Sequence, residues 1–293
     1  MTKNIFYLLI LATVSSCAFN GMFLHPFELN EDSSFKGYSD KYNDTIELSF
    51  LGDQPVFNTL TGEKVKHNYT IESQNFIGSK GDTLNSWFLK PNENYNGKTI
   101  YFLHGNAGNV VFQYRLVEPF VKRGYQLFMI DYSGFGFSTG ESTRSNVVQN
   151  GYDGMEHLLN MEDLQYEQLF IYGQSLGGHL ASVVANKYED QIDGLIVEGA
   201  FNSHKAVAAT RIPILPWVFV KEMYSGKDSI QEFNKPFLSI HSEEDKTVKY
   251  KLGKKLYDKG NEPKWHYKID SCHICGPLYY ADSIIARMNK MTE

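Results

Sequence analysis

The residues of this sequence best suited to chemistry form a short motif around Ser175. Positions 173–177 read GQSLG, a G-x-S-x-G pattern that follows an apolar run ending at Tyr172 and precedes a stretch with the composition of a helix. A serine on so sharp a strand-to-helix turn is held in strained backbone, and the flanking glycines leave room where a Cβ atom would clash. The pattern therefore predicts Ser175 as a nucleophile whose hydroxyl stands above a sheet.

A serine hydroxyl needs a base, and an imidazole base needs a carboxylate that fixes its tautomer. In this arrangement the acid and then the histidine follow the serine along the chain. Asp245 comes just after a predicted strand, and His273 comes just after the last one. Glu243 and Glu244 are neighbouring acids, but position favours Asp245. Of the nine histidines, only His266 also lies beyond this acid, and it falls inside a predicted strand.

The oxyanion of a tetrahedral intermediate needs hydrogen-bond donors, and the amide of Leu176 supplies one. Positions 104–109 read HGNAGN after another predicted strand, where Gly105 lets the backbone turn so that the amide of Asn106 supplies a second. A phosphate-binding loop would need a Lys and a Ser or Thr that are missing here, and the glycines after position 131 miss the dinucleotide-binding spacing by one residue. We expect neither a metal nor an organic cofactor.

Two cysteines, Cys272 and Cys275, bracket the predicted base. In an oxidising compartment this pair could form a disulfide that stiffens the histidine loop, and two free thiols are the alternative. A redox role would need the cysteines to open a helix in a thioredoxin-like unit, and a zinc site would need further ligands at fixed spacing. Neither context is visible in the sequence.

The first seventeen residues are typical of a targeting segment. Lys3 gives a charged start, residues 5–14 are apolar, and residues 14–17, VSSC, resemble the bacterial lipobox, whose cysteine is acylated and becomes the new N-terminus. We therefore expect a signal peptide over residues 1–16 and export to a bacterial cell envelope. Lipid on Cys17 would anchor the protein to a membrane, the outer membrane facing the periplasm in a Gram-negative bacterium. An ordinary secretory peptide with a chance cysteine is the alternative.

The elements that must position the motifs follow from hydrophobic periodicity. Residues 17–44 are polar and turn-rich, and we interpret them as a lipidated tether and an entry segment to the domain that carry no chemistry. The domain at 45–293 opens with antiparallel strands, and then strands alternate with helices, which predicts an α/β fold with a mostly parallel, doubly covered sheet. The expected strands are 45–50, 66–72, 83–89, 99–103, 126–130, 168–172, 195–197, 236–240 and 264–269, and the expected helices are 110–122, 144–160, 176–188, 248–259 and 279–291.

A strongly apolar stretch at 212–220 is broken by two prolines. Proline prevents a regular helix through this stretch and disfavours a central strand. We therefore predict a small lid insertion over residues 202–235 that covers the site, and a buried connector is the alternative.

The composition agrees with a single catalytic domain. The chain has 293 residues, of which 42% are hydrophobic and 14% aromatic, which is typical of a globular protein. The net charge of -6 comes from 34 acidic and 28 basic residues spread along the chain, without a basic cluster that could follow a phosphate backbone. Nucleic acid is not an expected partner. The expected partners are a small-molecule or acylated substrate and a membrane.

These motifs resemble the α/β-hydrolase superfamily, and within it the Bem46-like group, which includes mammalian ABHD-type and bacterial YfhR-like proteins. In two places the chain departs from the pattern: Ser133 stands where relatives usually carry Arg, and His241-Ser242 replaces the usual His-Gly. The resemblance rests on HGNAGN at 104–109, DYSGFG at 131–136, GQSLGG at 173–178, Asp245 with Val248, and His273.

This resemblance implies an α/β-hydrolase fold and a serine hydrolase that cleaves carboxylic esters or thioesters through an acyl-enzyme. Some relatives remove acyl groups from proteins. Two other functions stay open at this point. One is a serine peptidase of the same fold, and the other is a catalytically silent lipoprotein that uses the pocket for binding.

Overall fold

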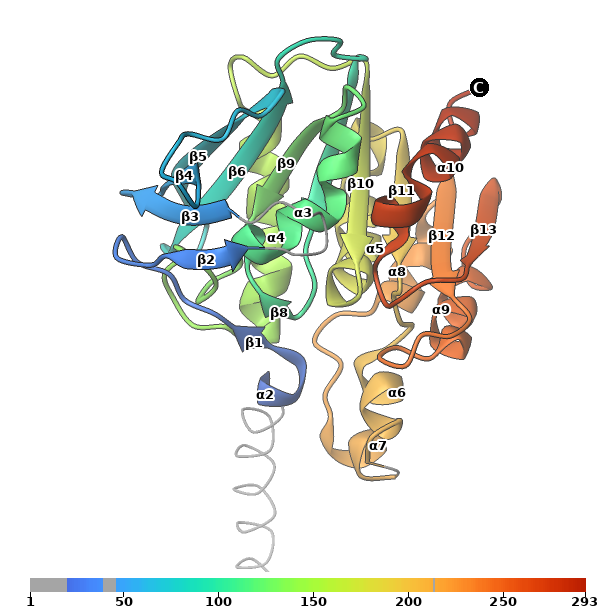
Figure 1. Ribbon diagram of the computed structural model, residues 1–293. Helices are drawn as coiled ribbons and strands as arrows, with labels where there is room; N and C mark the ends of the chain where they lie inside the picture. The colour runs from blue at the N-terminus through green and yellow to red at the C-terminus, as the bar shows by residue number, and fades with distance from the viewer. Residues whose placement is uncertain (1–19, 39–45, 213) are drawn as a thin grey trace, which may run out of the picture.

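The computed structural model describes residues 20–38, 46–212 and 214–293. Its centre is an eight-stranded sheet in the order β13-β12-β11-β10-β7-β9-β6-β5 (Figure 1). The strands from β13 to β9 pair in parallel, and β6 and β5 join antiparallel at one edge. The mostly parallel sheet with antiparallel N-terminal strands that the sequence predicts is thus confirmed.

The strands of the central sheet have the following bounds: β5 Tyr69–Ile77, β6 Thr83–Pro91, β7 Lys98–Leu103, β9 Gln126–Ile130, β10 Gln168–Gln174, β11 Gly194–Glu198, β12 Phe237–Ser242 and β13 Lys264–Ile269. A three-stranded antiparallel sheet and one short parallel pair complete the strands of the described residues: β2 Phe35–Tyr38, β3 Ile46–Leu51 and β4 Gln54–Thr59 in the first, β1 His25–Pro26 and β8 Ala107–Gly108 in the second.

Helices cover both faces of the central sheet (Figure 1). On one face α3 and α10 pack on the strands through apolar residues such as Phe120 and Ile284. On the other face α4, α5, α8 and α9 do so through residues such as Leu180 and Ile230. The helices are α2 Asn20–Phe23, α3 Val110–Val121, α4 Arg144–Leu159, α5 Leu176–Lys187, α6 His204–Ala209, α7 Leu215–Phe219, α8 Gly226–Glu232, α9 Tyr250–Tyr257 and α10 Gly276–Lys290, with a 3-10 turn at Glu189–Gln191.

The described part of the predicted tether is packed against the domain, which corrects our interpretation of residues 17–44. β1 pairs in parallel with β8, and the amide of His25 donates to the carbonyl of Asn106 at 2.8 Å. Phe23 of α2 is buried and stacks edge-on against His204 of α6, with 5.0 Å between ring centroids. A few apolar side chains hold this segment through long-range contacts, which a search for periodic patterns does not detect. The predicted signal peptide and Cys17 lie outside the described residues.

The predicted lid at 202–235 is smaller in the structure. α6 and α7 project from the end of the sheet, between β11 and β12 (Figure 1). α8 belongs to the helical layer instead, because Ile230 and Phe233 are buried in the core and Gly226 packs directly against His179 of α5. The cap is therefore α6, α7 and the loops around them. None of the helices among the described residues is long and apolar enough to span a bilayer.

Candidate active site

Ser175 lies on a sharp turn between β10 and α5, with φ 56° and ψ −117°. The amide of Ser175 donates to the carbonyl of Glu198 at 2.8 Å, which ties the turn to the neighbouring strand β11. The flanking glycines are required by close backbone contacts. A Cβ on Gly173 would lie 2.2 Å from the carbonyl oxygen of Gly177, and one on Gly177 would lie 2.0 Å from that of Leu103. The strained serine is thus held by its surroundings and not by its own conformational preference.

Ser175 opens onto a pocket whose wall comes from five separate parts of the chain. The turn itself contributes Ser175 and Leu176, and the loop after β7 contributes Asn106. The remaining lining residues come from α2, from the cap with the loop before it, and from the loop after β12: Met22 and Phe23; Phe201, Val207, Ala208 and Arg211; Thr247 and Val248. The pocket combines a mostly apolar wall with a few polar groups beside the serine, which is the usual character of a small-molecule site.

The loop that carries Asn106 is held from both sides. The side chain of Gln113 accepts from the amide of Gly105 at 3.4 Å and donates to the carbonyl of Ala107 at 2.7 Å. The carbonyl of Asn106 accepts from His25. The amide of Leu176 is at the first position of α5, where a helix has no carbonyl to offer it. Both predicted oxyanion donors therefore lie on rigid backbone at the wall of the same pocket.

Asp245 and His273 are in direct contact, since Nδ1 of His273 lies 2.6 Å from Oδ2 of Asp245. The other carboxylate oxygen accepts from the amides of Thr247 and Val248 at 2.8 and 2.9 Å. Burial alone would raise the pKa of Asp245, but hydrogen bonds from His241, His273 and Val248 and the charge of His273 hold it well below its usual range. Asp245 is therefore a carboxylate at neutral pH. Its neighbours Glu243 and Glu244 are exposed: the carboxylate of Glu243 accepts from Lys268, and the amide of Glu244 donates to the hydroxyl of Ser242.

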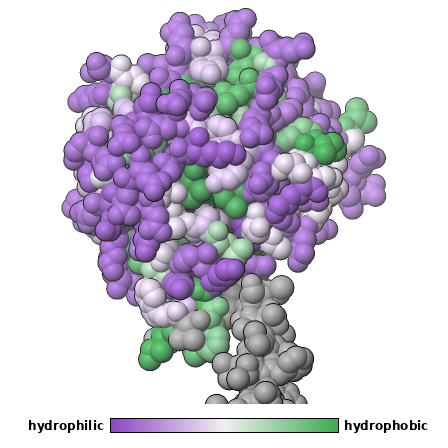
Figure 2. Space-filling model, turned by 180° about the vertical axis from the view of Figure 1, so that it is seen from behind, coloured by the Kyte–Doolittle hydropathy of each residue, from purple (hydrophilic) through white to green (hydrophobic). Residues whose placement is uncertain are grey.

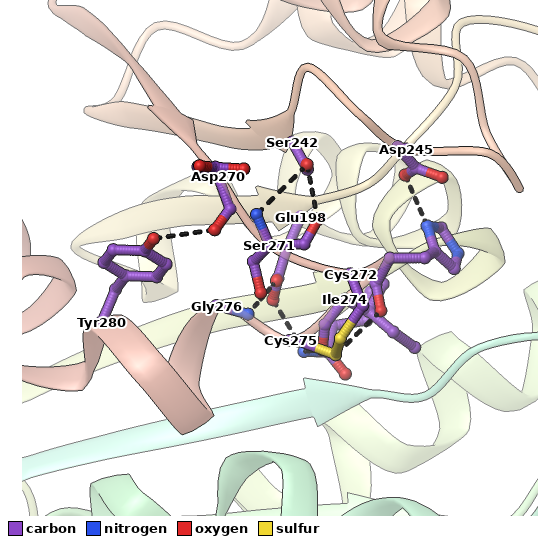
Figure 3. The surroundings of a disulfide bond; sticks show 12 residues. Glu198, Ser242, Asp245, Asp270, Ser271, Cys272, Ile274, Cys275, Gly276 and Tyr280 are labelled. Atoms are coloured by element: carbon purple, nitrogen blue, oxygen red, sulfur yellow. Dashed lines mark hydrogen bonds and ion pairs between the residues drawn. A yellow bond between two sulfur atoms is a disulfide. The ribbon is translucent and has the colours of Figure 1, made fainter.

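The loop around His273 is cross-linked. The sulfurs of Cys272 and Cys275 are bonded, with their Cα atoms 5.4 Å apart, so the bridge spans His273 and Ile274 (Figure 3). Ile274 has a positive φ of 53°, which a β-branched residue adopts only when its surroundings impose it. The hydroxyl of Ser242 donates to the carbonyl of Ser271 at 2.6 Å. The serine that replaces the glycine of relatives thus adds one more support to this loop.

Glu198 is a part of the site that the sequence analysis missed. Its buried carboxylate accepts from Tyr172, Gln174 and the amide of Gly276, and burial raises its pKa while these bonds oppose the shift. The carbonyl of Glu198 accepts from the amide of Ser175, and its carboxylate accepts from the amide of Gly276 at the start of α10, as Figure 3 shows for the second bond. Glu198 thus connects the serine turn with the start of α10. The sequence did offer one signal for this residue, because Glu198 is an acidic residue directly after a predicted strand.

Gly199, next in the chain, has a φ of 56°, and a Cβ there would lie 2.9 Å from Cε1 of His273. This glycine lets the imidazole pack against the end of β11. β11 is the neighbour of β10, which ends one residue before Ser175. The fold thereby brings the histidine loop to the same edge of the sheet as the serine turn.

Met22, Phe23 and Arg211 were also missed as lining residues. No motif marks them, because Met22 and Phe23 fall in a segment interpreted as a tether and Arg211 in the cap. The guanidinium of Arg144 connects these parts, since it bonds Oδ1 of Asn20 at 3.3 Å and the carbonyl of Lys221 at 2.7 Å. α2 and the cap are thus joined beside the pocket.

A buried cluster of His179, His204 and Glu222 is the one set of described residues whose side chains could together hold a metal, with ligand atoms within 4.8 Å of one another. Hydrogen bonds already account for most of these atoms. His204 Nδ1 lies 3.2 Å from the Glu222 carboxylate, which also accepts from the amides of His204 and Lys205 at the start of α6. Burial raises the pKa of Glu222, but these bonds bring it down to about 2. We interpret the cluster as the anchor of the cap.

Hydrogen bonds also account for Ser133, which stands in place of the arginine of relatives. Its hydroxyl contacts Oδ2 of Asp82 and Oδ1 of Asn150, both at 2.9 Å. The loop after β9 is therefore held by a compact polar network, away from the residues that line the pocket.

A mostly parallel sheet with a serine on the turn after a central strand, and an Asp–His pair on the loops after later strands, defines the class of α/β-hydrolases. Comparisons with known proteins agree. A family described as the alpha/beta hydrolase fold matches residues 98–228. The uncharacterised protein YfhR of Escherichia coli K12 is 30% identical over 202 residues, covering 67% of this chain and 70% of YfhR.

Protein bem46 of Schizosaccharomyces pombe is 29% identical over 172 residues, with 57% of this chain and 58% of bem46 covered. Among solved structures, an esterase of Pyrococcus furiosus superposes with a TM-score of 0.63 at 15% identity, covering 76% of this chain and 91% of the esterase. That similarity shows the fold. The chain belongs to the α/β-hydrolases, and within them to the Bem46-like group, as its motifs indicate.

Proposed function

We propose that this chain is a serine hydrolase that cleaves carboxylic ester or thioester bonds through an acyl-enzyme, with Ser175 as nucleophile, His273 as base and Asp245 as the orienting acid. The observation that carries the proposal is the position of Ser175, held in strained backbone on the wall of a pocket that Asn106 and Leu176 also line. The contact between His273 and Asp245 supports it, because Nδ1–H donates to the carboxylate and leaves Nε2 with its lone pair.

In this mechanism His273 takes the proton of the Ser175 hydroxyl as the oxygen attacks the carbonyl carbon of the substrate. The amides of Asn106 and Leu176 donate to the oxyanion. The bond to the leaving alcohol or thiol then breaks, and the leaving group takes the proton from His273. A water molecule repeats the sequence on the acyl-enzyme: its proton passes to His273 and then to Ser175, and the carboxylic acid is released.

The proposal includes attachment to a membrane through acylated Cys17, after export to a bacterial cell envelope. The sequence VSSC at 14–17 and the apolar run before it support this part. Two relatives carry names that agree with a lipid environment: a membrane protein of Saccharomyces cerevisiae, 28% identical over 180 residues, and the lysophosphatidylserine lipase ABHD12 of Danio rerio, 26% identical over 184 residues and covered over 48% of its length. Incorporation of radioactive palmitate that is lost in Cys17→Ser would test it.

The catalytic proposal is tested by labelling the purified protein with a fluorophosphonate probe and by measuring turnover of p-nitrophenyl esters of increasing chain length. Ser175→Ala should abolish labelling and lower turnover by about 10⁴-fold to 10⁶-fold. Ser182→Ala is the matched control, because Ser182 is a buried serine of α5 that is not among the pocket residues, and it should keep both. A Ser175→Ala variant with most of its activity would refute the role of this serine.

A further inference from the structure

Large apolar side chains are exposed together on the cap. Ile214, Leu215 and Trp217 are exposed over 76%, 52% and 57% of their surfaces. Figure 2 shows apolar surface gathered at this end of the molecule, over α6 and α7. We define the cap patch as six exposed residues within twelve positions: Ile212, Ile214, Leu215, Trp217, Phe219 and Met223. A group of this kind marks a surface that meets an apolar partner.

The cap patch begins directly beside the pocket. Arg211 lines the pocket, and the patch starts at the next residue, Ile212. Val207 and Ala208 of α6 line the pocket as well, so the cap has a pocket-facing side and an exposed apolar side. Whatever covers the patch therefore lies next to the mouth of the pocket.

The N-terminal end of the described chain lies at the same end of the molecule. α2, α6 and α7 lie at this end in Figure 1. α2 packs against α6 through Phe23 and His204, and its first residue, Asn20, is hydrogen-bonded to the guanidinium of Arg144, which also donates to the carbonyl of Lys221 in the cap. Cys17 is three residues before Asn20, and three residues span at most about 10 Å. A lipid on Cys17 would therefore keep α2 and the cap within about 10 Å of the bilayer surface.

The residues of the cap patch are of the types found at the surface of a lipid bilayer. Tryptophan is enriched at the level of the lipid headgroups, where its ring is half in apolar and half in polar surroundings. Arg211, directly before the patch, and Lys221, between Phe219 and Met223, are exposed and would meet the anionic headgroups of a bacterial membrane. Exposed apolar side chains with basic residues beside them are the arrangement of an interfacial anchor.

We propose that the cap patch inserts into the bilayer that holds the N-terminal lipid, so that the pocket opens onto the membrane surface and takes an acyl ester or thioester from it. This inference rests on the proposed hydrolase function and narrows its substrates to acyl groups held in a membrane. The anchor sets the distance to the bilayer and the patch sets the orientation of the pocket.

Insertion is tested by fluorescence of the full chain reconstituted in vesicles of phosphatidylethanolamine and phosphatidylglycerol with brominated acyl chains. Of the three tryptophans, Trp87 is fully buried and Trp265 is half-buried, so Trp217 should be the one that the bromines quench, by about twofold. The quenching should disappear in Trp217→Phe. A matched control adds Tyr279→Trp to this variant, because Tyr279 is exposed over 60% of its surface on α10, away from the cap, and should stay unquenched.

The consequence for catalysis is tested with the double variant Leu215→Asp and Trp217→Asp, neither of which lines the pocket. Hydrolysis of a fluorogenic acyl ester in the vesicles should fall by at least about tenfold, because two charges oppose insertion, while hydrolysis of soluble p-nitrophenyl acetate and fluorophosphonate labelling stay unchanged. A wild type without labelling would refute the hydrolase function, although Trp217 could still be quenched.

Two results would overturn the insertion itself in a protein that labels normally. One is an unquenched Trp217 together with equal vesicle rates for wild type and double variant. The other is a wild type that is dimeric in detergent by analytical ultracentrifugation while the double variant is monomeric, since the patch would then be covered by a second copy of the chain.

Discussion

The strain at the serine turn can be measured as stability. Ser175 has φ 56° and ψ −117°, a conformation that costs a residue with a Cβ about 1–3 kcal/mol. Glycine adopts positive φ freely, but its unfolded chain has more conformations, which costs the folded state about 0.4–1 kcal/mol. Both Ser175→Gly and Ser175→Ala lack the hydroxyl, so its contribution to stability drops out of the difference between the two variants. We therefore expect the glycine variant to be the more stable by about 1 kcal/mol.

The assay is urea unfolding of both variants, with the free energy of unfolding taken from midpoints at unchanged m. A matched control is the same pair of substitutions at Ser182, which lies inside α5 with ordinary helical backbone. There the order should be reversed, with glycine less stable than alanine by about 1 kcal/mol. If Ser175→Gly were less stable than Ser175→Ala, the turn would not be strained and its geometry would have another cause.

Three further predictions follow from the structure. Asp245→Asn should lower kcat by about 10³-fold to 10⁴-fold in ester hydrolysis, because the amide no longer holds His273 in its tautomer; an unchanged kcat would mean that another group orients the imidazole. Reduction with dithiothreitol should lower the kcat of the wild type, since the bridge of Cys272 and Cys275 holds the histidine loop, and it should have no effect on a variant with serine at both positions; equal responses would contradict this. Burial raises the pKa of Asp131 from 3.8 to about 7, so the folded state holds a proton that the unfolded state releases and stability falls as pH rises from about 4 to about 7. Asp131→Asn should remove this part of the pH dependence, at most about 4 kcal/mol in thermal or urea unfolding between these pH values, and an unchanged profile would contradict the assignment.

The order of strands and helices was largely predictable because it depends on local patterns. Apolar runs bounded by turn residues located the strands of the parallel sheet to within a few residues. The prediction of the antiparallel strands was less accurate: β4 of the three-stranded sheet was not predicted, and β5 at the edge of the central sheet extends to Ile77 through polar residues. Its Ser73 and Asn75 are satisfied by Asn85 and Gln54 from neighbouring strands, which compensates for their polarity. A sequence pattern does not indicate such hydrogen-bond partners, because they come from other strands.

The sequence by itself determined the serine turn, because the steric demand for glycine on both sides of Ser175 is a local property of the backbone. It also determined the order of the acid and the histidine, since loops after parallel strands end at one edge of the sheet. Only the tertiary structure decided that Asp245 and not its acidic neighbours contacts His273, because that choice depends on a contact between two loops.

The tertiary structure also decided that the N-terminal segment belongs to the site. Phe23 and the cap residue Ala208 lie on one pocket wall although nearly two hundred positions separate them in the chain. Glu198 gained its role in the same way, by accepting from Gly276 across 78 positions. These contacts arise from packing between distant segments, which depends on shape and burial in three dimensions and leaves no spacing in the sequence by which it could be found.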